Sequence, residues 1–220
     1  MLWAVVPAKL GGAVKTRLGA TLTASQRHAL AQAMLSDVLA TLAAVPTLAG
    51  TVVVTRDDVV ESLAERHGAI ALHETRGGGL NAAVAEGIAA CRARGATAVV
   101  VVMGDLPCLD ARELASALER LPERGVLAVP SLDGTGTNVL AVRPLDVLPE
   151  THFGPGSLAL HRTAAQSRGL ELVTCELRGA ALDVDTAQDL AVLGGRSTCG
   201  HATRAVLDAF ASERAPLRDG

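Results

Sequence analysis

The sequence predicts a single α/β domain built on a mostly parallel, Rossmann-like sheet that is flanked by helices. Short runs rich in Val alternate along the chain with longer segments of helical period, a pattern typical of a doubly wound sheet. The 220 residues suffice for one domain with a full core. Hydrophobic residues make up 49% of the chain and aromatic residues only 1%, so Val, Leu, Ile and Ala must build that core.

Each element follows from its local pattern. Short apolar runs are predicted as strands, the sixth of them as a late antiparallel excursion; they span 2–6, 51–55, 69–72, 98–102, 126–130, 139–142 and 170–175. Segments with apolar stripes at helical spacing are predicted as helices; they span 25–44, 59–66, 81–94, 111–121, 158–168, 187–193 and 203–211.

The run of valines at 98–102 is predicted to form the centre of the sheet, because it has no polar alternation and suits burial on both faces. It ends in Gly-Asp-Leu-Pro, which turns the chain and stops the strand. Asp105 is thereby held at the carboxyl end of a central strand, where open α/β sheets bind ligands. The alternative is that Asp105 only caps the helix starting near Ala111.

A basic, glycine-containing loop follows the first strand. It carries Lys9, Lys15 and Arg17 together with Gly11 and Gly12. Backbone N–H groups in such a loop can approach phosphates closely while the cations neutralise their charge. The order of residues is not that of a Walker loop. We interpret the segment as a phosphate-binding loop; the alternative is an ordinary solvated turn.

Three further segments combine polar groups with helix starts or strands. Asn81 follows three glycines and can either cap the next helix or read a base or ribose. Ser157 begins a helix, as an anion site or merely as its N-cap. Asp183 and Asp185 would point the same way in a strand, which is costly unless they are solvated or bind a cation.

Together these groups suit a nucleoside triphosphate with a divalent cation. Mg²⁺ is usually held by one or two carboxylates plus substrate phosphates. Asp105 and Asp185 would be those carboxylates, and Lys9, Lys15 and Arg17 would hold the triphosphate as pyrophosphate departs. We assign Lys9, Lys15 and Asp105 as the catalytic residues.

In these motifs the chain resembles the guanylyltransferases of coenzyme F420 biosynthesis, which act on 2-phospho-L-lactate or phosphoenolpyruvate. The resemblance runs in order from residue 7 to about residue 190 and is most specific in GTGTN and FGPGSxxxH. The matching segments are Pro7–Lys9, Lys15–Leu18, Gly79–Ala83, Gly104–Pro107, Gly134–Asn138, Phe153–Ser157 with His161, and Asp183–Thr186.

This resemblance implies a GT-A-like nucleotidyltransferase fold and assigns further residues. Thr137, Gly154 and Ser157 would hold the phosphorylated acid, and Leu80 and Asn81 would lie near the guanosine. Asp105 and Asp185 would carry the metal ions. His161 matches the motif, although a helix-packing role is an equal alternative.

The implied reaction transfers GMP from GTP to the phosphate of a small acid with release of pyrophosphate. Phosphoenolpyruvate is favoured by analogy, with 2-phospho-L-lactate and 3-phospho-D-glycerate as the other acceptors. Two alternatives stay open. One is another nucleotidyltransferase of this fold, of the molybdenum-cofactor or sugar-phosphate type; the other is a non-catalytic nucleotide-binding module.

Composition limits the partners and the setting. A net charge of −3 and scarce aromatic residues argue against nucleic acid and anionic membranes as partners. Four scattered cysteines and the lack of a signal-like N-terminus indicate a reducing cytoplasm. We expect residues 1–193 to form the nucleotidyltransferase domain and 194–220 a partly helical, frayed extension. The oligomeric state is left open.

Overall fold

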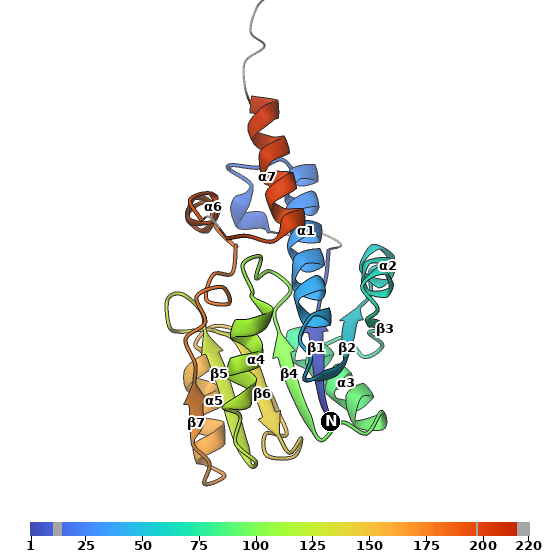
Figure 1. The fold of residues 1–220 in the computed structure, drawn as a ribbon, viewed down its shortest axis with the longest axis vertical. Coiled ribbons are helices and arrows are strands. Elements are labelled where there is room, and N and C mark those ends of the chain that lie inside the picture. The colour runs from blue at the N-terminus through green and yellow to red at the C-terminus, as the bar shows by residue number, and fades with distance from the viewer. Residues whose placement is uncertain (11–14, 197, 215–220) are drawn as a thin grey trace, which may run out of the picture.

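A computed structural model of the chain describes residues 1–10, 15–196 and 198–214. Seven strands form one sheet in the order β3-β2-β1-β4-β6-β5-β7 (Figure 1). The strands are β1 (Leu2–Pro7), β2 (Leu48–Thr55), β3 (Ile70–His73), β4 (Ala98–Val102), β5 (Gly125–Pro130), β6 (Thr137–Arg143) and β7 (Leu172–Thr174). The helices are the 3-10 helix η1 (Thr16–Leu18), α1 (Ala24–Ala43), α2 (Asp58–Arg66), α3 (Leu80–Ala93), α4 (Ala111–Glu119), α5 (Ser157–Gln166), α6 (Ala187–Gly194) and α7 (His201–Arg214).

The predicted fold class is confirmed, and apart from η1 each of these elements lies within three residues of its predicted bounds. β6 runs antiparallel to β4 and β5, and the other neighbouring strands are parallel, which confirms the predicted excursion. β6 therefore begins where β4 ends: Val102 pairs with Val139, and the Met103 N–H donates to the Asn138 carbonyl at 3.1 Å.

Residues 182–185 do not form a strand, the conformation in which Asp183 and Asp185 would point the same way. Their backbone N–H groups bond elsewhere: Val184 donates to the carbonyl of Asp105 at 3.4 Å, and Asp185 donates to the Asp189 carboxylate at 3.1 Å. The segment instead runs as an extended loop past the turn that follows β4, which brings Asp183 and Asp185 to the carboxyl edge of the sheet.

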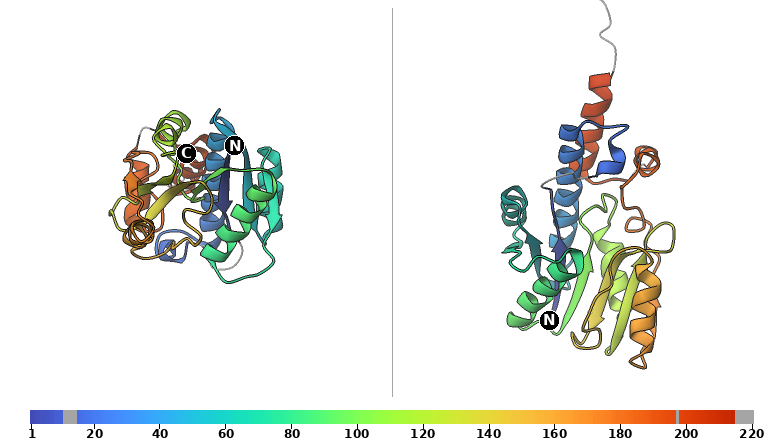
Figure 2. Two further views of the ribbon diagram at one scale, coloured as in Figure 1. Left: turned by 90° about the horizontal axis from the view of Figure 1, so that it is seen from below. Right: turned by 180° about the vertical axis from the view of Figure 1, so that it is seen from behind.

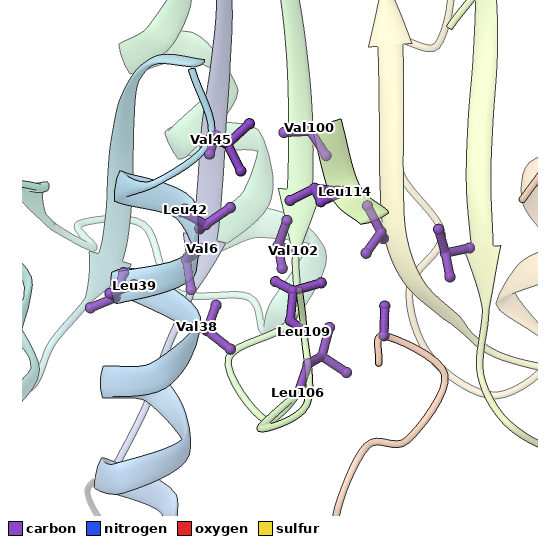
Figure 3. Close-up of a cluster of buried hydrophobic side chains, with 14 of the residues drawn as sticks. Val6, Val38, Leu39, Leu42, Val45, Val100, Val102, Leu106, Leu109 and Leu114 are labelled. Atoms are coloured by element: carbon purple, nitrogen blue, oxygen red, sulfur yellow. The ribbon is translucent and has the colours of Figure 1, made fainter. Parts of the chain in front are cut away.

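The central strand is buried on both faces, as predicted. Alternate side chains serve opposite faces: Val100 and Val102 pack with α1, α2 and α4, whereas Val99 and Val101 pack with α3 and α5. Figure 3 shows the first of these clusters, in which Leu106 continues the packing past the strand end. The view from behind in Figure 2 shows α3 and α5 on the opposite face. The turn after β4 is thus anchored by its own apolar residues.

Asp110, not Asp105, caps α4. Its Oδ1 accepts hydrogen bonds from the backbone N–H groups of Arg112 and Glu113, both at 2.9 Å. The alternative in which Asp105 is only a helix cap is therefore wrong, because the cap position lies five residues further along. Asp105 is left available for other contacts.

The C-terminal helix α7 is longer than predicted and packs beside α1, beyond the carboxyl edge of the sheet (Figures 1 and 2). Asp37 of α1 is 9% exposed and anchors its first turn, accepting hydrogen bonds from the N–H groups of Ala202 at 2.9 Å and Thr203 at 2.8 Å. Phe210 joins the apolar cluster between the helices. A boundary at residue 193 stays a prediction. Among the described residues, no helix is both long and apolar enough to cross a membrane.

Candidate active site

Two aspartates converge on one lysine at the carboxyl edge of the sheet. The Lys15 Nζ lies 2.5 Å from Asp105 Oδ2 and 2.6 Å from Asp185 Oδ1. The side chain of Lys15 is 9% exposed, whereas those of Asp105 and Asp185 are 28% and 43% exposed. Three predicted site residues, which are up to 170 positions apart in sequence, therefore meet at one point.

The backbone conformation and the pKa of Lys15 are both unusual. Its φ of 49° is the one positive φ at a non-glycine residue among those described, in a region that L-residues seldom adopt. Burial alone would lower the pKa of its ammonium group, but Asp105 and Asp185 outweigh this effect and raise the pKa to about 12. Lys15 therefore stays charged at any physiological pH.

Asp183 lies beside this group without contacting the lysine. The amide of Asn138 donates to Asp183 Oδ1 at 3.3 Å and to the carbonyls of Ala180 and Ala181 at 2.9 and 3.1 Å. Burial, reinforced by the charge of Asp105, raises the pKa of the Asp183 carboxyl above its usual value. Asn138 is a site residue to which we gave no role from sequence, although it ends the GTGTN motif.

The donor set fits a magnesium ion. Asp105 and Asp185 already direct oxygens at one cationic centre, which Lys15 supplies here. No group of three or more His, Cys, Asp or Glu residues is arranged to hold a metal within the described ranges. Two carboxylates completed by substrate phosphates are a usual arrangement for Mg²⁺. The Mg²⁺ assignment itself stays a proposal.

Two adjoining hollows extend from this cluster. One, of about 280 Å³, is lined by Lys9, Lys15, Asp105 and Asp185 and by apolar residues of α1. The other, of about 350 Å³, reaches the glycine loop at 77–79 and Leu80. Pro7, Ala8 and Lys9 line both hollows. A bound molecule can therefore extend from the carboxylates to the glycine loop.

The remaining basic-loop residues are placed differently. Lys9 is exposed beside both hollows, as a phosphate ligand should be. Arg17 is exposed in η1, and within the described residues no ion pair joins it to the aspartates. Gly11 and Gly12 lie outside the described residues.

Asn81 does not cap α3, because the N-cap is Gly79, with a φ of 84°. The Asn81 side chain instead holds the segment before α5. Its Oδ1 accepts from the Thr151 hydroxyl at 3.0 Å and from the Phe153 N–H at 2.8 Å, and its Nδ2 donates to the Phe153 carbonyl at 3.0 Å. Leu80, at 39% exposure, lines the larger hollow.

The residues expected to hold the acid lie together on the α5 side of the sheet. Ser157 is the first residue of α5, and the N-cap is Gly156, so the alternative in which Ser157 is the cap is wrong. The Ser157 hydroxyl donates to Thr137 Oγ1 at 3.2 Å, and His161 Nδ1 lies 3.1 Å from the same oxygen. Gly154, with a φ of 132°, precedes α5, and its carbonyl accepts a hydrogen bond from the Ser157 N–H at 3.1 Å.

Comparison with known proteins shows the family to which the chain belongs. The family model described as "Guanylyl transferase CofC like" matches residues 2–203. A phosphoenolpyruvate guanylyltransferase of Sphaerobacter thermophilus is 39% identical over 197 residues, covering 90% of this chain and 94% of the relative. A 3-phospho-D-glycerate guanylyltransferase of Phenylobacterium zucineum is 40% identical over 214 residues, covering 94% and 95%.

Solved structures share the fold at lower identity. A nucleotidyl transferase from Methanothermobacter superposes with a TM-score of 0.62 at 17% identity, covering 95% of this chain and 99% of that one. A chain from Desulfovibrio desulfuricans G20 superposes with a TM-score of 0.72 at 20% identity, covering 96% and 95%. The resemblance stated from the motifs is confirmed, and the chain is a nucleotidyltransferase that belongs to the CofC-like guanylyl transferase family.

Proposed function

We propose that this protein transfers the GMP group of GTP to the phosphate of a small phosphorylated carboxylic acid and releases pyrophosphate, as a cytoplasmic step of coenzyme F420 biosynthesis. The observation that carries this proposal is the convergence of Asp105 and Asp185 on one cationic point, beside hollows that continue to the glycine loop. This arrangement offers a place for a triphosphate and its cation at the carboxyl edge of the sheet.

The reaction needs no general base. A phosphate monoester has a second pKa of about 6 and is mostly dianionic near neutral pH. One of its oxygens attacks the α-phosphorus of GTP in line, the bond from that phosphorus to the bridging oxygen breaks, and pyrophosphate leaves. Because two anions must meet, catalysis rests on positioning and on the screening of charge.

The residues divide this work between them. Lys9 and Lys15 hold the triphosphate and offset the charge that develops on the leaving pyrophosphate. Asp105 and Asp185 would hold Mg²⁺, which when bound screens the phosphates and orients them. Arg17 would contact the phosphates from η1, and Leu80 and Asn81 would border the nucleoside. Thr137, Gly154 and Ser157 would bind the acid.

Phosphoenolpyruvate is the acceptor that we favour, because several relatives above 35% identity carry that name. The 40% identical relative named for 3-phospho-D-glycerate makes that acid the second candidate. The three candidate acids share one carboxylate and one phosphate, so all of them suit a site with buried hydroxyls and positive-φ glycines.

The test is product identification. The enzyme is incubated with Mg²⁺, an equimolar mixture of the four ribonucleoside triphosphates, and phosphoenolpyruvate, 2-phospho-L-lactate or 3-phospho-D-glycerate. Pyrophosphate release is followed, and the product is identified from its mass by mass spectrometry. We expect a guanylylated acid, formed fastest from phosphoenolpyruvate. Nucleotide binding without pyrophosphate from any acid would instead favour a non-catalytic module, and a product formed only with sugar phosphates or pterins would favour another transferase of this fold.

A further inference from the structure

A chain of hydrogen bonds passes through His161 beneath the turn that precedes α5. The backbone N–H of His152 lies 2.9 Å from His161 Nε2, and Thr137 Oγ1 lies 3.1 Å from His161 Nδ1. The imidazole is 0% exposed and meets the Phe153 ring edge-on, with centroids 5.1 Å apart. His161 therefore connects this turn to the start of β6.

The partners of His161 decide where its proton lies. A backbone N–H can only donate, so Nε2 must accept and carries no hydrogen. Burial, followed by the charge of the neighbouring His152, lowers the pKa of His161 to about 4, so the ring is neutral in the physiological range. A neutral imidazole holds its one proton on the other nitrogen. Nδ1 therefore donates to Thr137 Oγ1.

Thr137 consequently accepts two hydrogen bonds. One comes from His161 Nδ1 and the other from the Ser157 hydroxyl at 3.2 Å. A hydroxyl oxygen has two acceptor lone pairs and one hydrogen. With both lone pairs engaged, the hydrogen is left to donate, and within the described residues no other side-chain or backbone acceptor bonds to it.

We propose that His161 is a positioning residue that fixes the Thr137 hydroxyl as a hydrogen-bond donor toward an anionic oxygen of the acid substrate. This inference rests on the proposed function, because the acceptor is a carboxylate or phosphate oxygen of that acid. His161 does not touch the substrate. Its role is to occupy one lone pair of Thr137, so that the hydroxyl hydrogen cannot turn away from the substrate.

Two substitutions separate this role from simple packing. An asparagine amide ends near the position of Nδ1, so His161→Asn keeps a donor for Thr137. A glutamine amide ends near the position of Nε2, so His161→Gln keeps an acceptor for the His152 N–H but removes that donor. We expect His161→Asn to keep the KM for the acid within about threefold of wild type. His161→Gln should raise it about tenfold, the cost of one misdirected hydrogen bond to a charged group. The kcat and the KM for GTP should stay unchanged in both.

A double-mutant cycle tests the coupling. Thr137→Val removes the hydroxyl and should raise the KM for the acid tenfold to about a hundredfold. Adding His161→Gln to Thr137→Val should then cause no further rise, because the group on which His161 acts is gone. Additive effects, or equal effects of His161→Asn and His161→Gln, would overturn the proposal. His67→Asn serves as a matched control, since it breaks a 2.9 Å contact with the Ser36 hydroxyl far from the turn and should leave the acid KM unchanged.

A measurement on the unmodified protein completes the test. Long-range proton–nitrogen NMR of the free enzyme at pH 7 should show the His161 proton on Nδ1. A proton on Nε2 would refute the inference whatever the enzyme activity. Conversely, a wild-type enzyme that releases no pyrophosphate with any of the three acids contradicts the proposed function, while the tautomer can still be read.

Discussion

The ammonium of Lys15 competes with any metal for the oxygens of Asp105 and Asp185. The competition follows from the two short contacts and from the low exposure of the lysine. A cation that binds the two aspartates must displace this group, which the triphosphate then attracts. If the site binds Mg²⁺ and GTP as proposed, Lys15 would link the metal and the nucleotide.

Lys15→Met should tighten divalent-metal binding in the absence of nucleotide by roughly tenfold, because it removes a competing charge a few ångströms from the carboxylates. The same change should weaken GTP binding and lower kcat. Manganese titration followed by electron paramagnetic resonance measures the first effect, and calorimetry with GTP measures the second. A metal affinity that is unchanged or weaker would mean that the lysine does not occupy the metal position.

Asp105→Asn should lower kcat/KM by at least about a hundredfold and leave the fold intact, because it removes one of the two charges that would hold the cation in the proposed site. Asp110→Asn is the matched control: it makes the same chemical change in the same loop, and Asn caps a helix as well as Asp. Steady-state kinetics at saturating Mg²⁺ and circular dichroism would check both. Wild-type rates in Asp105→Asn would refute the metal assignment.

His161 should also make the stability depend on pH. Its pKa is about 4 in the folded protein and about 6.5 in an unfolded chain, so the unfolded state binds more protons between these values. The contribution is therefore fully present above pH 6.5 and is lost as the pH falls toward 4, up to about 3 kcal/mol. The free energy of unfolding, measured with urea at several pH values in this range, should depend less steeply on pH in His161→Asn than in the wild type. An equal pH dependence of the free energy of unfolding in both proteins would contradict the lowered pKa of His161. The pKa of His67 is also lowered, so His67 accounts for part of the pH dependence that remains in the variant.

At the scale of elements, α7 depends on a buried cap that another helix supplies. Asp37 lies within α1 and bonds to residues 165 and 166 positions away. Gly200 makes this approach possible, since a Cβ there would lie 2.0 Å from Cγ of Asp37. The sequence did not reveal this contact, because an aspartate in mid-helix looks like an ordinary exposed residue until its distant partners are known.

Asp37→Ala should destabilise the protein by about 2 kcal/mol, because it removes two hydrogen bonds to a buried carboxylate. The loss should be concentrated in α7, so amide exchange over 201–210 should accelerate more than exchange in β4. Asp57→Ala is the control, as it removes an exposed cap from α2 and should leave α7 protected. Unchanged exchange in α7 would show that apolar contacts with Phe210 hold the helix without the cap.

For the whole molecule, the hollows are lined by segments that follow β1, β3 and β4 and by the loop before α6. If GTP and Mg²⁺ bind there as proposed, together they would connect distant parts of the chain. We expect their joint effect on Tm, measured by scanning fluorimetry, to exceed the sum of their separate effects, because each ligand raises the affinity for the other. Strict additivity would contradict a shared site.

The sequence predicts the fold and the members of the site better than their contacts. The strand pattern fixes which loops reach the carboxyl edge, so Asp105, Asp185 and Lys15 could be expected to meet there. It could not show that the lysine lies between the aspartates, or that Asn81 binds residues 151–153 rather than capping its own helix. Such contacts join segments about 70 or more residues apart and depend on packing that no local pattern encodes.

The reversed direction of β6 has a consequence for how selectivity can diverge. β6 starts at the carboxyl edge, and because side chains alternate along a strand, its first two residues face opposite sides of the sheet. Thr137 faces the α5 side, and Asn138 faces Asp183. Neighbouring residues at the start of β6 thus present their side chains to different partners. If Thr137 contacts the acid as proposed, substitutions on the α5 side can change acceptor selectivity in an evolving lineage, or in a designed library, while the bond from Asn138 to Asp183 is kept.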